Sequence, residues 1–200
     1  YTKEPETLEW IDKFNQDREI IFWDIGANIG LYSIYAAQKH KNIKVTSFEP
    51  STSNLRVLSR NISINDLHNK ISIVPLALTN HKNKFLNLKE CKFIEGGALN
   101  SFNENFDSNG NLFKPLNTYK TLGTSIDYLI ESKIIDIPNY IKIDVDGIEH
   151  LILEGGLKTL KNKNIKSILI EVNEDFFLQK DKIIKIMKQS NYELLSKEMS

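Results

Sequence analysis

EIIFWDIGANIGLYS, residues 19–33, is the stretch that decides the fold of this chain. Its apolar run ends at Asp24, and a glycine-rich segment at 26–30 then leads into apolar residues at helical spacing. This pattern predicts a buried strand, a tight turn and the start of a helix. Glycine in the turn lets a ligand approach the backbone closely, because no Cβ intervenes. Small ligands of open α/β sheets bind at the carboxyl ends of strands, so we expect a binding site here.

A second apolar run, residues 43–48, ends in Glu49, whose carboxylate can accept hydrogen bonds from both hydroxyls of a ribose. A nucleoside-containing cofactor is therefore expected. A dinucleotide site would need G-x-G-x-x-G, but Asn28 takes the place of the second glycine and the third glycine comes early. S-adenosylmethionine fits the turn better, since it has no phosphates and its methionine tail carries an amine that Asp24 could attract.

The composition is that of an ordinary globular domain. The chain has 200 residues, of which 40% are hydrophobic and 26% charged, so we treat residues 1–200 as one domain. The formal net charge is zero, so the sequence lacks the excess of positive charge that is typical of nucleic-acid-binding proteins. The single cysteine, Cys91, excludes an intramolecular disulfide and indicates a reducing, cytoplasmic compartment, and no apolar stretch is long enough for membrane insertion. Because the chain begins with Tyr1 rather than Met, we expect it to be part of a longer polypeptide.

Apolar runs alternate along the chain with helical patterns. Strands are expected at 20–24, 43–48, 71–75, 139–143 and 166–171, and helices near 30–40, 52–65, 147–161 and 180–190. Such alternation predicts an α/β fold with a mainly parallel central sheet flanked by helices. One more strand is expected at 192–195.

Residues 80–125 do not follow this alternation of strands and helices. They contain a short alternating strand at 85–88, a polar loop at 103–111 and a second strand at 119–122, before a helix that begins at Ser125. Long irregular insertions in compact domains are usually functional or disordered. We interpret this region as an inserted hairpin or loop near the substrate, with a plain surface excursion as the alternative.

The segment IKIDVDGIEH, residues 141–150, holds the main candidates for catalysis. Asp144 ends the fourth strand and Asp146 follows two residues later, so both carboxylates can face the crevice beside the cofactor. Either could act as general base for a hydroxyl or bind a hard cation such as Mg²⁺. Alternatively, Asp146 caps the next helix and Glu149 completes a capping box, which leaves Asp144 as the stronger candidate. His150 is either a further base or a surface histidine.

Glu171 and Asn173 end the fifth strand, and they would lie beside Asp144 if the last two strands are neighbours. Carboxylate and amide oxygens together can bind a divalent cation, so these three residues form a candidate metal site. The same groups could instead only hydrogen-bond a sugar.

Together these segments resemble the FkbM family of S-adenosylmethionine-dependent methyltransferases. The matching motifs are DIGANIGLYS at 24–33, Phe48-Glu49-Pro50, Asn61, Pro75-x-Ala77-Leu78, IDVDGIE at 143–149, and Gly155. The resemblance covers nearly the whole chain and implies a class I, Rossmann-like sheet. It would put the methionine part of the cofactor against Asp24 and the glycine turn, the ribose on Glu49 and the adenine near Ala77. The cofactor-binding residues expected are Asp24, Gly26, Ala27, Asn28, Gly30, Tyr32, Glu49, Pro50 and Ala77.

The resemblance also implies an O-methyltransferase that acts on a hydroxyl of a sugar, a glycan or a related small metabolite. We assign catalysis to Asp144, with Asp146, His150 and Glu171 as helpers. One alternative is a NAD-type oxidoreductase, which would need the glycine pattern that this turn lacks. The other is a non-catalytic methyltransferase-like module that binds no cofactor.

Overall fold

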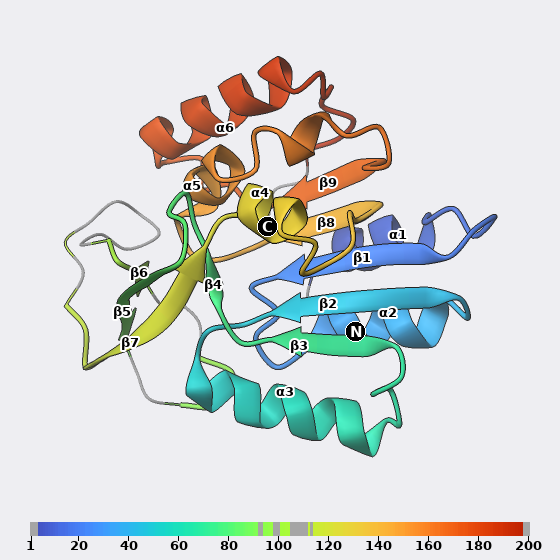
Figure 1. The fold of residues 1–200 in the computed structure, drawn as a ribbon, viewed down its shortest axis with the longest axis horizontal. Helices are drawn as coiled ribbons and strands as arrows, with labels where there is room; N and C mark the ends of the chain where they lie inside the picture. Colours follow the sequence, from blue (N-terminus) through green and yellow to red (C-terminus); the bar gives the residue numbers. More distant parts are fainter. Residues whose placement is uncertain (1–3, 92–93, 98–100, 105–111, 113, 198–200) are drawn as a thin grey trace.

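Five parallel strands form the main sheet of the computed structural model, which describes residues 4–91, 94–97, 101–104, 112 and 114–197 (Figure 1). Their order across the sheet is β3-β2-β1-β8-β9. The strands are β1 (Ile20–Ile25), β2 (Ile43–Phe48), β3 (Ile71–Val74), β8 (Tyr140–Ile143) and β9 (Ser167–Ile170). All five predicted strands of the main sheet are confirmed to within one residue, and so is the predicted α/β class.

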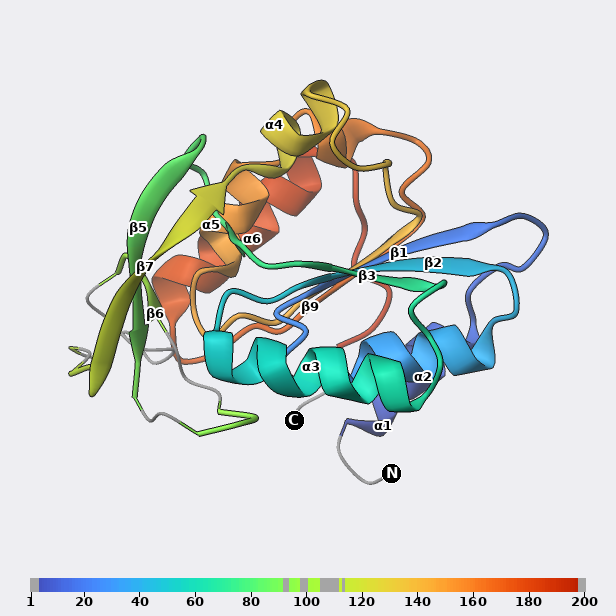
Figure 2. The ribbon, with the colours of Figure 1, turned by 60° about the horizontal axis from the view of Figure 1, so that its bottom comes forward.

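Helices cover both faces of this sheet (Figure 2). One face carries α1 (Pro5–Asp12), α2 (Leu31–Lys39) and α3 (Thr52–Ile64), and the other carries α4 (Ile126–Glu131), α5 (Glu149–Glu154) and α6 (Phe177–Gln189). Each face of the sheet has its own hydrophobic core. Successive side chains of β1 pack into opposite cores: Phe22 packs on the face that carries α1, α2 and α3, and Trp23 on the face that carries α4, α5 and α6. Burial on both faces explains why the central strands β1 and β8 are nearly continuous apolar runs. Within the described part of the chain, no helix is long and apolar enough to cross a membrane.

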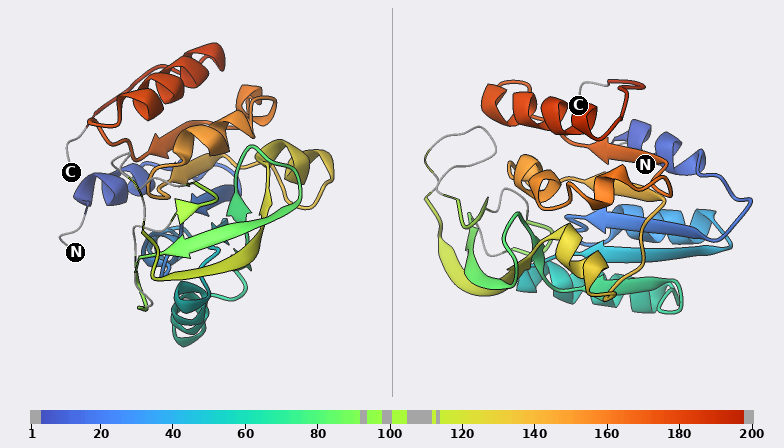
Figure 3. Two further views of the ribbon diagram at one scale, coloured as in Figure 1. Left: turned by 90° about the vertical axis from the view of Figure 1, so that its left-hand side faces the viewer. Right: turned by 45° about the horizontal axis from the view of Figure 1, so that its top comes forward.

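A second sheet of four strands lies across the carboxyl ends of the main strands (Figure 3). Its order is β4-β7-β5-β6, with β4 (Ala77–Leu78), β5 (Lys84–Glu90), β6 (Ser101–Phe102) and β7 (Asn117–Thr124). The strands expected at 85–88 and 119–122 lie inside β5 and β7. Most of the polar loop at 103–111 lies outside the described residues. The inserted region therefore faces the edge of the main sheet where the glycine turn lies.

Two expected elements are wrong. The helix expected at 147–161 is divided into α5 and a 3₁₀ turn, Thr159–Lys161, because Asp127 binds the groups that would continue it: its amide donates to the Gly155 carbonyl and its carboxylate accepts from the amides of Lys158 and Thr159. A Cβ on Gly155 would lie 2.2 Å from the backbone oxygen of Thr79. No strand forms at 192–195, where Leu194 and Leu195 are 82% and 87% exposed. The helix expected from Ser125 is confirmed, and the Ser125 side chain accepts a hydrogen bond from the Tyr128 amide.

Gly26→Ala should be the most disruptive substitution in the turn after β1. Gly26 has a φ of 82°, and a Cβ there would lie 1.8 Å from the backbone oxygen of Asp144. Strained backbone and overpacking together should lower the free energy of unfolding by about 3 kcal/mol or more. Gly96→Ala is the matched control, because Gly96 also has positive φ but its nearest contact would be 3.6 Å. Denaturant unfolding measures the free energy of unfolding of both variants. Equal decreases in Gly26→Ala and Gly96→Ala would contradict the packing argument.

Candidate active site

A cavity of about 350 Å³ lies where the ends of β1, β2 and β8 face the second sheet. This volume is within the range of small-molecule sites. The predicted cofactor residues that line it are Gly26, Ala27, Asn28, Tyr32, Glu49, Pro50 and Ala77. The predicted catalytic residues that line it are Asp144, Asp146 and Glu171. Asp24, Gly30, His150 and Asn173 are not part of its wall.

The turn after β1 brings backbone to the cavity surface. Gly26 allows it to pass directly against the end of β8, as the close approach to Asp144 indicates. Gly30, with a φ of 89°, packs against α3 rather than at the cavity, because a Cβ on Gly30 would lie 2.4 Å from Cδ1 of Leu58. Gly30 thus lets α2 and α3 pack closely, whereas Gly26 shapes the binding surface.

Glu49 is held at the cavity wall by the backbone around it. Its side chain accepts hydrogen bonds from the amides of Asn28 and Ser51, each at 2.8 Å, and the residue is 5% exposed. Burial raises the pKa of Glu49 to about 7, although these hydrogen bonds oppose the rise. The result is a fixed acceptor carboxyl group directly beside the turn.

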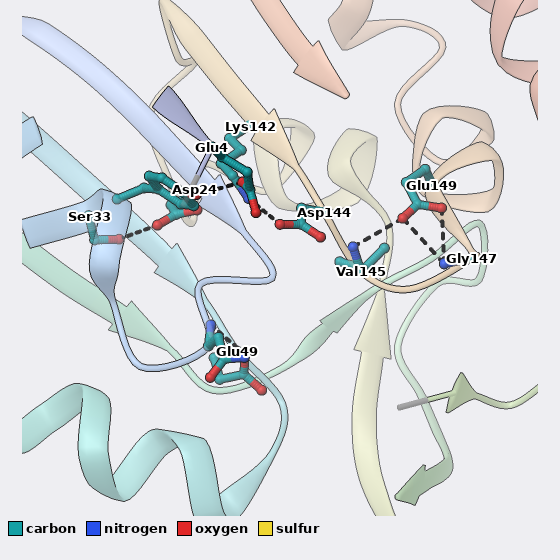
Figure 4. A network of polar contacts seen from close by, with 11 residues as sticks. Glu4, Asp24, Ser33, Glu49, Lys142, Asp144, Val145, Gly147 and Glu149 are labelled. Carbon is teal, nitrogen blue, oxygen red and sulfur yellow. Dashed lines mark hydrogen bonds and ion pairs between the residues drawn. The ribbon is translucent and has the colours of Figure 1, made fainter. Parts of the chain in front are cut away.

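Asp24 lies behind the cavity wall rather than on it. Its side chain is fully buried, and Ser33 Oγ donates to Oδ2 at 2.6 Å (Figure 4). In the sheet, Asp24 pairs with Ser47 on one side and Lys142 on the other. Burial raises the pKa of Asp24, and the Lys142 ammonium and the Ser33 hydroxyl work against that rise. This position does not favour the amine contact expected of Asp24.

Asp144 and Glu171 form a carboxyl pair at the ends of the neighbouring strands β8 and β9. Their side chains are hydrogen-bonded, and Lys142 Nζ donates to Asp144 Oδ2 at 2.6 Å. The bond to Asp144, followed by burial, raises the pKa of Glu171 to about 8. Glu171 is then protonated at neutral pH, while the ammonium of Lys142 favours the charged form of Asp144. The arrangement places two hydrogen-bonded carboxyl groups, one of them beside an ammonium, on the cavity wall.

Lys142 is a site residue that the sequence interpretation missed. It is 2% exposed, lines the cavity, and its Nζ lies 4.7 Å from the centre of the Tyr32 ring. Burial acts to lower the pKa of Lys142, but the charges of Asp144, Asp24 and Glu4 outweigh burial and the pKa is raised. A lysine inside an apolar strand is itself a signal, because a buried charge needs a partner.

Glu149 organises the loop that carries Asp146. Its carboxyl group accepts from the amides of Val145 at 3.1 Å and Gly147 at 3.2 Å (Figure 4). Gln179 Nε2 also donates to it. The expected capping box is wrong, because the N-cap of α5 is Ile148 and Asp146 adopts a φ of 61°. Glu149 nevertheless binds backbone amides, and this holds the loop against the cavity.

Glu149→Gln should remove part of the pH dependence of stability. Burial raises the pKa of Glu149 from 4.5 to about 7, so the folded protein holds a proton that the unfolded chain releases. The free energy of unfolding should therefore fall by about 3 kcal/mol from this group as the pH rises from 4.5 through 7. Denaturant unfolding at pH 5 and pH 8 would show a smaller fall in the variant than in Glu193→Gln, which changes an exposed carboxylate. Equal falls would contradict this role.

His150 and Asn173 lie away from the cavity. His150 is 5% exposed within α5, so the surface alternative is wrong, and burial followed by the charge of Lys182 lowers its pKa. Asn173 Oδ1 accepts from the amide of Asp175 in its own loop at 2.9 Å. Among the described residues, no group of three or more His, Cys, Asp or Glu side chains could hold a metal ion.

The inserted region supplies part of the cavity wall. Leu88 and Phe102 of the second sheet line it, and so do Gly96 and Gly97. Asn54 of α3 holds this glycine pair, since its Oδ1 accepts from the Gly96 amide at 3.0 Å and its Nδ2 donates to the Gly97 carbonyl at 3.1 Å. Asn54 is a further residue that the sequence interpretation missed. Nothing in its local sequence identifies the loop that it binds.

The parallel sheet, the glycine turn after β1 and the acidic residue after β2 define a class I methyltransferase-like fold. Solved structures agree. The methyltransferase FkbM from Methylobacillus flagellatus KT matches with a TM-score of 0.57 and 18% identity over 88% of this chain and 38% of that chain. Precorrin-6y C5,15-methyltransferase from Geobacter metallireducens GS-15 matches with a TM-score of 0.55 and 15% identity over 96% of this chain and 74% of that chain.

Residues 24–194 match the model of the methyltransferase FkbM domain, and the chain belongs to this family. A shorter stretch of 43 residues is 49% identical to methyltransferase sdnD from Sordaria araneosa, and it covers 22% of this chain. The match spans 17% of the length of that relative. The resemblance drawn from the motifs is therefore confirmed.

Proposed function

We propose that this protein is an S-adenosylmethionine-dependent O-methyltransferase that acts on a hydroxyl of a sugar, a glycan or a related small metabolite. One observation carries the proposal: Glu49 and the Asp144–Glu171 pair line one cavity. The first suits a ribose, and the second suits a hydroxyl that must lose its proton. Membership of the FkbM methyltransferase family supports this function over a NAD-type oxidoreductase.

The cavity fits the cofactor at two points. Gly26 lets the turn pass directly against the end of β8, which brings the Ala27–Asn28 backbone to the cavity wall, and beside it Glu49 offers a buried carboxyl group. We assign the ribose to Glu49, the adenine to the side of Pro50 and Ala77, and the methionine part to the Gly26–Ala27–Asn28 backbone and Tyr32. When bound, the cofactor supplies an activated methyl group for transfer to a nucleophilic oxygen.

The protein's task is then to orient the acceptor hydroxyl and to remove its proton. Asp144 is our general base, because Lys142 favours its charged form through the 2.6 Å contact. Glu171, protonated at neutral pH, donates to Asp144 and orients it. Asp146 extends the polar wall toward the acceptor, whereas His150 lies too far into the α5–α6 interface for the catalytic role first assigned to it.

The acceptor is assigned to the side of the cavity that the inserted region covers. The apolar surfaces of Leu88, Phe102 and Ile148 lie there together with the carboxyl groups of Asp144 and Asp146. A mixture of apolar surface and hydroxyl acceptors suits a sugar ring. A metal site is not proposed, because Asp144 already binds the Lys142 ammonium and Asn173 faces its own loop.

A methyl-transfer screen tests the function. Methyl-labelled S-adenosylmethionine is incubated with free sugars, nucleotide sugars and oligosaccharides, with and without chelator, and the products are analysed for O-methyl groups. Label on a sugar hydroxyl is expected, and label on nitrogen or carbon would contradict O-methylation. A parallel thermal-shift titration should show stabilisation by S-adenosylhomocysteine and none by NAD. Stabilisation by neither would favour the non-catalytic alternative.

A further inference from the structure

We propose that Glu4 binds the α-ammonium group of the methionine part of the cofactor. This inference rests on the proposed function and assigns a contact that neither the motifs nor the family match identifies. Glu4 precedes α1, and it is far in sequence from every motif of the site. Its side chain nevertheless lines the same cavity as the glycine turn.

The position of Glu4 is defined by α2. Tyr32 Oη donates to Glu4 Oε2 at 2.5 Å, and Tyr32 lies in the first turn of α2, two residues after Gly30. Both side chains line the cavity, so Tyr32 holds the Glu4 carboxylate next to the backbone that would carry the amino-acid tail. Figure 4 shows Glu4 beside Lys142 and near Asp24.

The alternative acid for this contact is Asp24, and its burial argues against it. Asp24 is 0% exposed and does not line the cavity, and its Oδ2 accepts from Ser33. A ligand amine could reach it only through the packed layer between β1 and α2. Glu4 is half-buried and opens onto the cavity, so an ammonium can reach it without any rearrangement of the core.

Acidic side chains gather around the Lys142 ammonium, which interacts with the charges of Asp144, Asp24 and Glu4. Glu4 therefore belongs to an acidic part of the site. Opposite charges within a partly buried site attract more strongly than in water, so this part of the site would attract the ammonium of a ligand.

Calorimetry with two ligands tests the assignment. S-adenosylhomocysteine carries the α-ammonium, and 5′-methylthioadenosine has the same nucleoside and sulfur without the amino-acid tail. For Glu4→Gln we expect about tenfold weaker binding of S-adenosylhomocysteine and unchanged binding of 5′-methylthioadenosine, since one charge-assisted contact is lost. Glu9→Gln, an exposed substitution on α1, should change neither affinity.

Tyr32→Phe provides a second test that keeps the Glu4 charge. It removes the hydroxyl that orients the carboxylate, so a smaller loss, specific to S-adenosylhomocysteine, is expected. Equal weakening of both ligands by Glu4→Gln, or no weakening of either, would overturn the assignment. Failure of the proposed function would look different, because the unaltered protein would then bind neither compound.

Discussion

Glu49→Gln should weaken the binding of S-adenosylhomocysteine by about a hundredfold. The carboxylate is expected to accept hydrogen bonds from two ribose hydroxyls, and each charge-assisted bond contributes roughly 1.5 kcal/mol or more. Glutamine keeps the size of the side chain, but one of its two ends becomes a donor and cannot accept from the amides of both Asn28 and Ser51. Calorimetric titration measures the affinity. Glu19→Gln, at the amino end of β1, is the exposed control.

The same substitution should also change how affinity depends on pH. Burial raises the pKa of Glu49 to about 7, so near pH 6 much of the protein without ligand carries a protonated Glu49. Ribose hydroxyls that donate to Glu49 favour the ionised form, and binding should then release a proton. Affinity should rise between pH 6 and pH 8 in the unaltered protein and stay level in Glu49→Gln. A parallel rise in both proteins would show that Glu49 is not the ribose ligand.

The sequence was sufficient to predict the main sheet, because each of its strands is a mostly apolar run that alternates with a helical pattern. It also located Glu49, whose place at the end of β2 follows directly from the run before it. Prediction of the contacts around Lys142 would have required the register that pairs Asp24 with Lys142 across β1 and β8. Once two strands are neighbours, a buried acid and a buried base at paired positions indicate one electrostatic unit. Strand order is not readable from local periodicity, so this pairing was missed.

The second sheet was less predictable for a related reason. Its strands β5 and β7 pair over seven positions, although a long segment of chain separates them. Glu90 at the end of β5 is 1% exposed and accepts from Ser51 Oγ at 2.8 Å and Tyr119 Oη at 3.0 Å. These bonds fasten the inserted region to the start of α3, next to Glu49. No local pattern indicates that a glutamate in an irregular stretch will bind a serine 39 residues away.

Asp144→Asn should reduce turnover by about a thousandfold while the affinity for S-adenosylhomocysteine changes little. Removal of a general base typically costs two to four orders of magnitude in rate. Asparagine keeps the shape of the side chain but cannot take a proton, and it leaves Glu49 and the glycine turn untouched. Single-turnover measurements with labelled cofactor would report the chemical step directly. Unchanged turnover would remove Asp144 from the mechanism, and an equal loss of cofactor affinity would make it a binding residue.

The substitution Glu171→Gln distinguishes the role of Asp144 as the general base from that of Glu171 as its hydrogen-bonding partner. Glutamine resembles the protonated form of Glu171 that a pKa of about 8 implies at neutral pH, so turnover at pH 7 should fall only a fewfold. In the unaltered protein, turnover should increase as the pH rises through 8, because loss of the shared proton makes Asp144 more basic. The variant has no such proton to lose, and its rate should be level in that range. Persistence of the increase in Glu171→Gln would mean that another group, and not this carboxyl pair, controls the pH profile.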